Sequence, residues 1–154
     1  MARRYDEAIK QYETVLDVEP EFTEANLLLA ITCSLKGDHE RAASQLLKIK
    51  DLENSPAQLS FAVYVYTAAG RKGEAQQAFN RLKVLLKQSN VSPLWMATAY
   101  AGRGENDEAF KWFEKVFEEQ SAPGVISLKV NPVFDGLRSD GRFRLLLQRS
   151  NLPV

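Results

Sequence analysis

The chain has 154 residues, of which 45% are hydrophobic and 26% charged, and its 20 basic residues balance its 20 acidic residues. This composition is typical of one soluble globular domain with a hydrophobic core, and the zero net charge excludes a general electrostatic attraction to nucleic acid or anionic lipid. The longest apolar runs, LLLAI and FAVYVY, are far too short to span a bilayer.

The first predicted element is a helix over residues 4–19, which Pro20 ends. Its apolar residues recur three or four positions apart and are Tyr5, Ala8, Ile9, Tyr12, Val15 and Leu16. No first helix of a hairpin precedes it, so we expect a half repeat over residues 3–22 that continues a longer array. Stacked repeats bury their apolar faces against neighbours, and the bare side of this helix should therefore promote self-association. The residues expected to carry that association are Tyr5, Ile9 and Tyr12.

A repeat with a period of 33 or 34 residues organises the chain from this helix onward. Each unit has a glycine (an arginine in the first unit), four residues, an alanine, three residues and a large apolar side chain. The four stretches are RRYDEAIKQY, GDHERAASQL, GRKGEAQQAF and GENDEAFKWF. Their alanines are Ala8, Ala42, Ala75 and Ala109. The spacing predicts that the same supersecondary unit is repeated along the chain.

Each unit is predicted to be a hairpin of two helices, called A and B. Gly37, Gly70 and Gly104 are expected to end the A helices, because a left-handed cap is least costly without a Cβ atom. Two A helices begin with a serine cap followed by proline, at Ser55-Pro56 and Ser92-Pro93. The three complete hairpins are expected over residues 23–55, 56–89 and 90–123.

This repeat resembles the tetratricopeptide repeat family, whose 34-residue unit is a helix–turn–helix with the same order of glycine, alanine and aromatic residues. The resemblance covers about residues 3–123. It is weaker in the A helices, where the early tryptophan of the family is replaced by Asn26, Leu59 and Pro93. The resemblance implies an all-α fold, in which stacked hairpins form a right-handed superhelix as a single domain over residues 1–154.

Residues 124–154 leave the period and are predicted to form a capping tail. A short helix from Val125 to Val130 is expected to end at Asn131-Pro132. Ser139 or Asp140 can cap a final helix. The apolar residues of that final helix are Phe143, Leu146 and Leu147.

The stretch NPVFDGLRSDGRFRLLL in this tail resembles a segment that closes such repeats in bacterial multidomain regulators. In those proteins the array follows a protein kinase, a nucleotide cyclase or a DNA-binding module. Gly141 stands where that segment usually has proline. The resemblance implies a regulatory context and no chemistry in this chain.

No group of residues in the sequence predicts an active site, a cofactor or a metal. His39 is the only histidine and is expected to be a solvated or capping side chain. Cys33 is the only cysteine and is expected to pack between helices. One histidine and one cysteine cannot build a usual structural zinc site. We therefore expect a protein that is not an enzyme, and the single cysteine and the charged start from Arg3 favour a cytoplasmic protein without a signal peptide.

The A helices are expected to line a concave groove that binds a protein or peptide, without contacts to nucleic acid or membrane. No charged residue lies between Pro56 and Gly70 or between Asn90 and Gly102, and such an apolar surface usually marks an interaction site. The residues expected to line the groove are Leu27, Leu28, Ile31, Phe61, Tyr64, Leu94, Trp95 and Thr98.

The resemblance also implies which partners are excluded. Carboxylate-clamp members of the family hold an acidic C-terminus with lysine, arginine and asparagine on this face, and the corresponding positions here carry Leu27, Leu28, Ile31, Ala57 and Phe61. Two functions stay open. The chain is either a scaffold that binds an apolar peptide or helix, or a regulatory or self-association segment of a larger signalling or transcription protein. In the second case the groove is filled intramolecularly or by a second copy.

Overall fold

The computed structural model describes residues 4–88, 91–119, 126 and 128–149. In this part of the chain every regular element is helical, which confirms the predicted all-α fold. In chain order the elements are α1 (Tyr5–Val18), α2 (Thr23–Lys36), α3 (His39–Leu46), the 3₁₀ helix η1 (Leu52–Asn54), α4 (Pro56–Ala68), α5 (Lys72–Gln88), α6 (Pro93–Gly102), α7 (Asn106–Glu118), the 3₁₀ helix η2 (Pro132–Leu137) and α9 (Gly141–Arg149).

The turns between the A and B helices have the same geometry in all three hairpins. Gly37, Gly70 and Gly104 adopt positive φ angles of 97°, 70° and 75°, as the glycine spacing predicted. In each turn the backbone amide of the residue after the glycine donates to the carbonyl of the residue four positions before the glycine. These hydrogen bonds run from Asp38 to Cys33, from Arg71 to Tyr66 and from Glu105 to Tyr100. This hydrogen bond closes the C-terminus of the A helix and directs the chain into the B helix.

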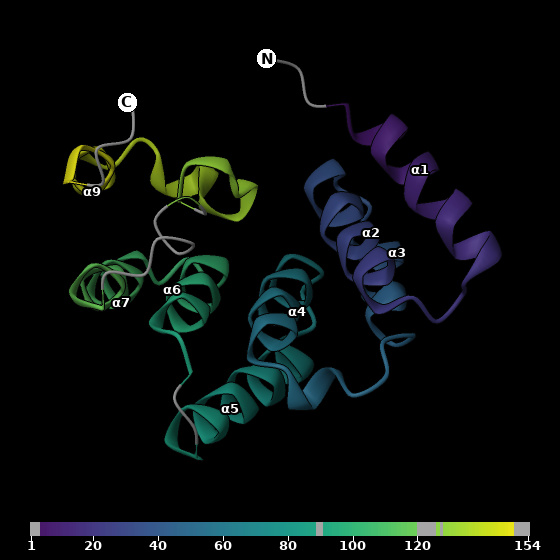
Figure 1. The fold of residues 1–154 in the computed structure, drawn as a ribbon, viewed down its shortest axis with the longest axis horizontal. Helices are drawn as coiled ribbons and strands as arrows, with labels where there is room; N and C mark the ends of the chain where they lie inside the picture. Colours follow the sequence, from purple (N-terminus) through teal and green to yellow (C-terminus); the bar gives the residue numbers. More distant parts are fainter. Residues whose placement is uncertain (1–3, 89–90, 120–125, 127, 150–154) are drawn as a thin grey trace.

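The hairpins follow one another along an arc, with α2, α4 and α6 on its inner side and α3, α5 and α7 on its outer side (Figure 1). Helix α1 lies at one end of the arc and α9 lies at the other (Figure 1). The inner side is therefore built from the A helices, as predicted.

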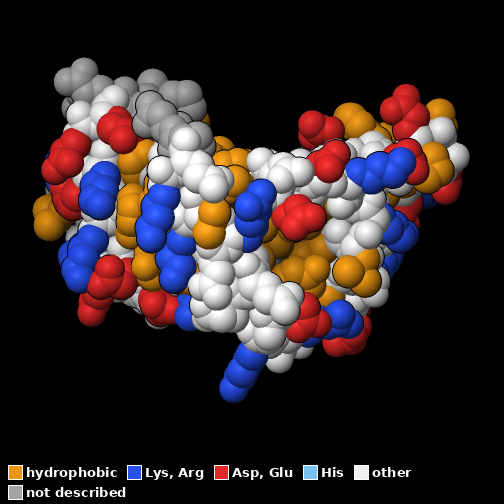
Figure 2. Space-filling model, turned by 90° about the horizontal axis from the view of Figure 1, so that it is seen from below, with side chains coloured by type: hydrophobic (Ala, Val, Ile, Leu, Met, Phe, Trp, Pro, Cys, Tyr) orange, Lys and Arg blue, Asp and Glu red, His pale blue; other side chains and the backbone are white. Residues whose placement is uncertain are grey.

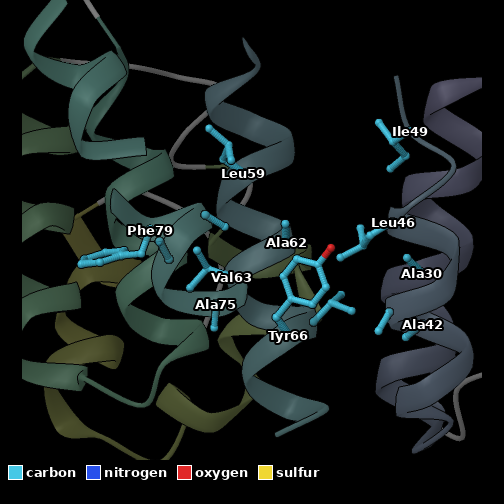
Figure 3. Packing of buried hydrophobic residues seen from close by; sticks show 14 of the residues in the cluster. Ala30, Ala42, Leu46, Ile49, Leu59, Ala62, Val63, Tyr66, Ala75 and Phe79 are labelled. Carbon is cyan, nitrogen blue, oxygen red and sulfur yellow. The ribbon is translucent and has the colours of Figure 1, made fainter. Parts of the chain in front are cut away.

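Small residues allow the helices of each hairpin to approach closely, and larger ones fill the space between hairpins. Ala30 of α2 and Ala42 of α3 are fully buried between the two helices of the first hairpin. Tyr66 of α4 points from the second hairpin towards the first, where Leu46 of α3 lies (Figure 3). Alternation of small and large side chains produces the dense packing that a stable core requires.

Helix α1 packs against α2 through one face only. Ile9 is buried in the cluster that contains Leu29 and Ala30, so its expected role in self-association is corrected: its side chain is not on the bare side of α1. The exposed apolar residues of this helix are Val15 and Val18, the latter with 79% of its surface exposed.

Helices α4 and α6 lie unusually close together. A Cβ atom added to Gly102 would lie 2.8 Å from the Cβ atom of Tyr64 and 2.9 Å from its Cα atom. Only glycine fits this contact, because real Cβ atoms do not approach neighbouring backbone so closely. The repeat pattern did not predict it.

The tail packs on the third hairpin. The ring of Phe134 in η2 is fully buried and meets the ring of Phe113 in α7 edge to face, with centroids 5.1 Å apart and planes at 84°. The final helix begins at Gly141, after Asp140 accepts a hydrogen bond from the Arg142 amide, as predicted. The three apolar residues predicted for it, Phe143, Leu146 and Leu147, are all buried.

The first part of the tail differs in detail from the prediction. Residue 126 and residues 128–130 are helical, whereas Val125 lies outside the described residues. Asn131 ends that segment and also starts η2, because its side chain accepts from the Val133 amide at 3.0 Å. The 3₁₀ helix was not predicted, and it supplies Phe134, which together with Phe143 is one of the largest fully buried side chains of the tail.

Candidate functional site

The eight predicted groove residues lie on α2, α4 and α6, but they differ in exposure. Leu28 is 43% exposed. Four are half-buried, namely Leu27, Phe61, Tyr64 and Trp95. Three are buried, namely Ile31, Leu94 and Thr98. The expected set is corrected for these last three, whose side chains are not available on the inner side of the arc.

Two observations bear on the burial of these residues on α6. The Thr98 hydroxyl donates to the Leu94 carbonyl at 2.8 Å, so its polar group is satisfied within the helix. Leu94 belongs to the same buried cluster as Leu128 and Phe134 of the tail. The tail therefore covers part of α6 that the sequence pattern left open.

The remaining residues define what we call the inner apolar surface: Leu27, Leu28, Phe61, Tyr64 and Trp95. The rings of Phe61 and Trp95 join α4 and α6 by an edge-on contact, with centroids 6.4 Å apart and planes at 61°. Neither α4 nor α6 carries a charged residue. This surface can thus contribute apolar and aromatic contacts, whereas ion pairs have no partner on these two helices.

A second feature, which the sequence pattern did not reveal, is a cleft of about 760 Å³ between α7 and α9. Phe110 and Leu145 contribute apolar walls, and Leu145 is largely exposed. Arg142 lies over the Phe110 ring at 4.2 Å from its centroid and pairs with Asp107 at 2.8 Å. Hydrogen bonds from Arg142 to Asp140 and Asp107 raise the pKa of its guanidinium. The cation is therefore held in place across the seam between the helices.

The same seam has a second ion pair, between Arg149 and Glu114 at 2.6 Å. Figure 2 shows lysine and arginine side chains in rows, with hydrophobic side chains between them, at the end of the molecule where α7 lies. Both pairs join the final helix to the last hairpin. Each exposed pair by itself contributes little to stability.

Cys33 and His39, the two residues whose side chains could suggest chemistry, differ in their surroundings. Cys33 is fully buried, and burial raises the pKa of its thiol, so the reactive thiolate is disfavoured. His39 is the first residue of α3, and its Nδ1 atom is buried without a hydrogen-bond partner in the described part of the chain. Within that same part, no group of three histidine, cysteine, aspartate or glutamate residues is placed to hold a metal ion.

None of the helices in the described residues combines the length and apolar character that crossing a membrane demands.

Comparison with known proteins gives a family match and one relative. The model of the tetratricopeptide repeat family matches residues 2–58, which include α1 and the first complete hairpin. The TPR repeat-containing protein YpiA of Bacillus subtilis is 25% identical over 126 residues, which are 79% of this chain and 29% of that protein. The chain thus spans less than a third of the length of this relative. No solved structure gives a significant match.

Proposed function

We propose that the chain, whose residues 2–58 match the tetratricopeptide repeat family, is a non-catalytic scaffold that binds an apolar peptide or helix of another protein on its inner apolar surface. Repeats of this family generally mediate contacts between proteins. The observation that carries the proposal is the Phe61–Trp95 ring pair, which lies on two neighbouring A helices without any charged residue.

The chemistry of this surface defines the partner. Large aromatic side chains bury roughly 150–250 Å² each and are frequent anchors of interfaces. Because α4 and α6 carry no charge, a bound segment would be uncharged along its contact face. Its affinity should depend weakly on salt, since screening acts on exposed charges.

The test begins with peptides selected for binding to this chain from a displayed library. We expect Trp95→Ala and Phe61→Ala each to weaken binding of the selected peptides about 10- to 30-fold, because each removes an anchor side chain. Titration calorimetry at low and high salt measures the affinity, and circular dichroism checks that the helices remain. Leu47→Ala is the matched control, because Leu47 is an exposed apolar residue that follows an outer helix.

Unchanged affinity in both ring variants would exclude the inner apolar surface as the binding site. A steep loss of affinity with rising salt would instead favour the charged outer helices.

A second candidate function, self-association, is favoured by the exposed valines of α1. Val15 and Val18 leave apolar surface in contact with water. If a second copy covers them, sedimentation velocity should show a concentration-dependent dimer that Val18→Glu reduces. The same substitution at Val84, an exposed valine of α5, should leave the dimer intact. A chain that stays monomeric at high concentration excludes this candidate.

We also place the protein in the cytoplasm as part of this proposal. Support comes from Cys33, a free and buried thiol of the kind that a reducing compartment preserves.

A further inference from the structure

A pocket of about 510 Å³ lies on the seam between α1 and α3. Leu16 of α1 and Leu29 of α2 give it apolar walls, and Asn26, Gln45 and Lys48 are among its polar lining residues. The pocket is bordered by the outer helices and shares only α2 with the inner apolar surface. Its role is therefore independent of the proposed scaffold function.

The side-chain oxygens of two buried amides in this pocket have no hydrogen-bond donor within the described part of the chain. The Asn26 side-chain nitrogen donates to the carbonyls of Pro20 at 3.0 Å and Phe22 at 3.1 Å, which fixes the orientation of the amide. Its Oδ1 atom then has no hydrogen-bond partner among the described residues. The same holds for the Oε1 atom of Gln45, a residue only 8% exposed. Buried polar atoms nearly always have a partner, so these two oxygens point to a missing donor.

Two charged side chains along the seam have no ion-pair partner in the described part of the chain. At one end Glu13 of α1 pairs with Arg41 of α3. One turn further along α1, Asp17 lines the pocket, and Lys48 lines it after the end of α3. Neither Asp17 nor Lys48 forms an ion pair with any residue that the structure describes. The pocket therefore offers one free carboxylate and one free ammonium group.

In the seam between α7 and α9, by comparison, both corresponding cations are paired. Arg142 and Arg149 are seven residues apart, as Arg41 and Lys48 are, and both arginines are paired with acids of α7. In the seam between α1 and α3 only Arg41, the first of the corresponding cations, is paired with an acid of α1. Lys48 is the cation left without such a partner.

We propose that this pocket binds a small zwitterion, an α-amino acid with an aliphatic side chain. Its ammonium group donates to Asp17 and to the unpaired oxygens of Asn26 and Gln45. Its carboxylate accepts from Lys48, and its side chain packs against the leucine walls. A ligand with both charges satisfies all four of these groups, whereas an amine alone leaves Lys48 without a partner and a carboxylate alone leaves the three acceptors without a donor.

The experiment is a titration of the isotope-labelled chain with L-leucine, followed by NMR. We expect saturable shifts of the side-chain amide signals of Asn26 and Gln45. N-acetyl-L-leucine and L-leucinamide each lack one charge and should bind about tenfold or more weakly, because each loses a charge-assisted hydrogen bond. Asp17→Asn and Lys48→Met should weaken leucine binding by a similar factor.

Two matched variants control for general effects of charge removal. Glu19→Gln removes a neighbouring acid outside this pocket, and Lys50→Met removes a neighbouring lysine whose partner is Glu21. Both should bind leucine as the unmodified chain does. Trp95→Ala should also leave leucine binding unchanged, so this site and the scaffold function can fail separately.

The proposal is overturned if leucine causes no saturable shift, in which case water satisfies the two oxygens. It is also overturned if N-acetyl-L-leucine and L-leucinamide bind as tightly as leucine. Equal binding by the Asp17→Asn and Lys48→Met variants would be a third contrary result. Because both residues lie on the surface of the seam, neither variant is expected to unfold the chain.

Discussion

Replacing Phe134 with alanine is expected to lower the free energy of unfolding by about 3–5 kcal/mol, the usual cost of deleting a buried aromatic side chain. The ring is fully buried and packs edge to face on Phe113 of α7. Its loss would open a cavity between η2 and the third hairpin, where Leu128 and Leu137 also lie. Urea denaturation followed by circular dichroism measures the change.

The control for this prediction is Val130→Ala in the same tail. Val130 is 66% exposed, so its truncation should change the free energy of unfolding by no more than about 0.5 kcal/mol. The two tryptophans, Trp95 and Trp112, pack at the cluster beside the tail and report on it by fluorescence. A cost below about 1 kcal/mol for Phe134→Ala would mean that the tail does not stabilise the array as a cap.

The hairpins could be predicted from the sequence because their signals are local. A glycine at the end of an A helix acts through its own φ angle and through one hydrogen bond to the preceding turn. The serine caps at Ser55 and Ser92 likewise act within a single turn, where each side chain accepts from a nearby amide. A period of such local signals therefore predicts the order and type of the helices.

Exposure on the inner side could not be predicted in the same way. Thr98 and Leu94 have the helical spacing of a groove residue, but their burial depends on elements that lie elsewhere in the chain. Leu94 is covered by the tail, whose 3₁₀ helix begins at Pro132 and has no repeat signal. Exposure is a property of the packed array, whereas the sequence period describes one unit at a time.

Seams between outer helices were missed for a related reason. Arg142 and Asp107 are 35 residues apart, and no local pattern connects them. The sequence also could not predict that the Oδ1 atom of Asn26 lacks a partner. The orientation of that amide is set by the two hydrogen bonds that its nitrogen donates. Asn26 stands where the family has a tryptophan, and that substitution was the single sequence signal near the pocket.

The other large effect is expected at Gly102, where alanine should lower the free energy of unfolding by about 1–3 kcal/mol, the typical cost of overpacking. A Cβ atom there would lie 2.9 Å from the Tyr64 Cα atom, which is backbone and cannot rotate away. Helix α6 would have to move from α4, and the Phe61–Trp95 ring contact joins the same two helices. The variant should therefore also weaken peptide binding on the inner apolar surface.

Gly73→Ala is the matched control, because it adds the same methyl group near the start of α5, where a Cβ atom would meet no atom within 4 Å beyond its own stretch of helix. With ordinary helical geometry, alanine there should raise the free energy of unfolding by about 0.4–1 kcal/mol by restricting the unfolded chain. The two substitutions are thus expected to change the free energy of unfolding in opposite directions, which one urea-denaturation series can measure. If Gly102→Ala is neutral or stabilising like Gly73→Ala, the close contact between α4 and α6 does not determine the spacing of the second and third hairpins.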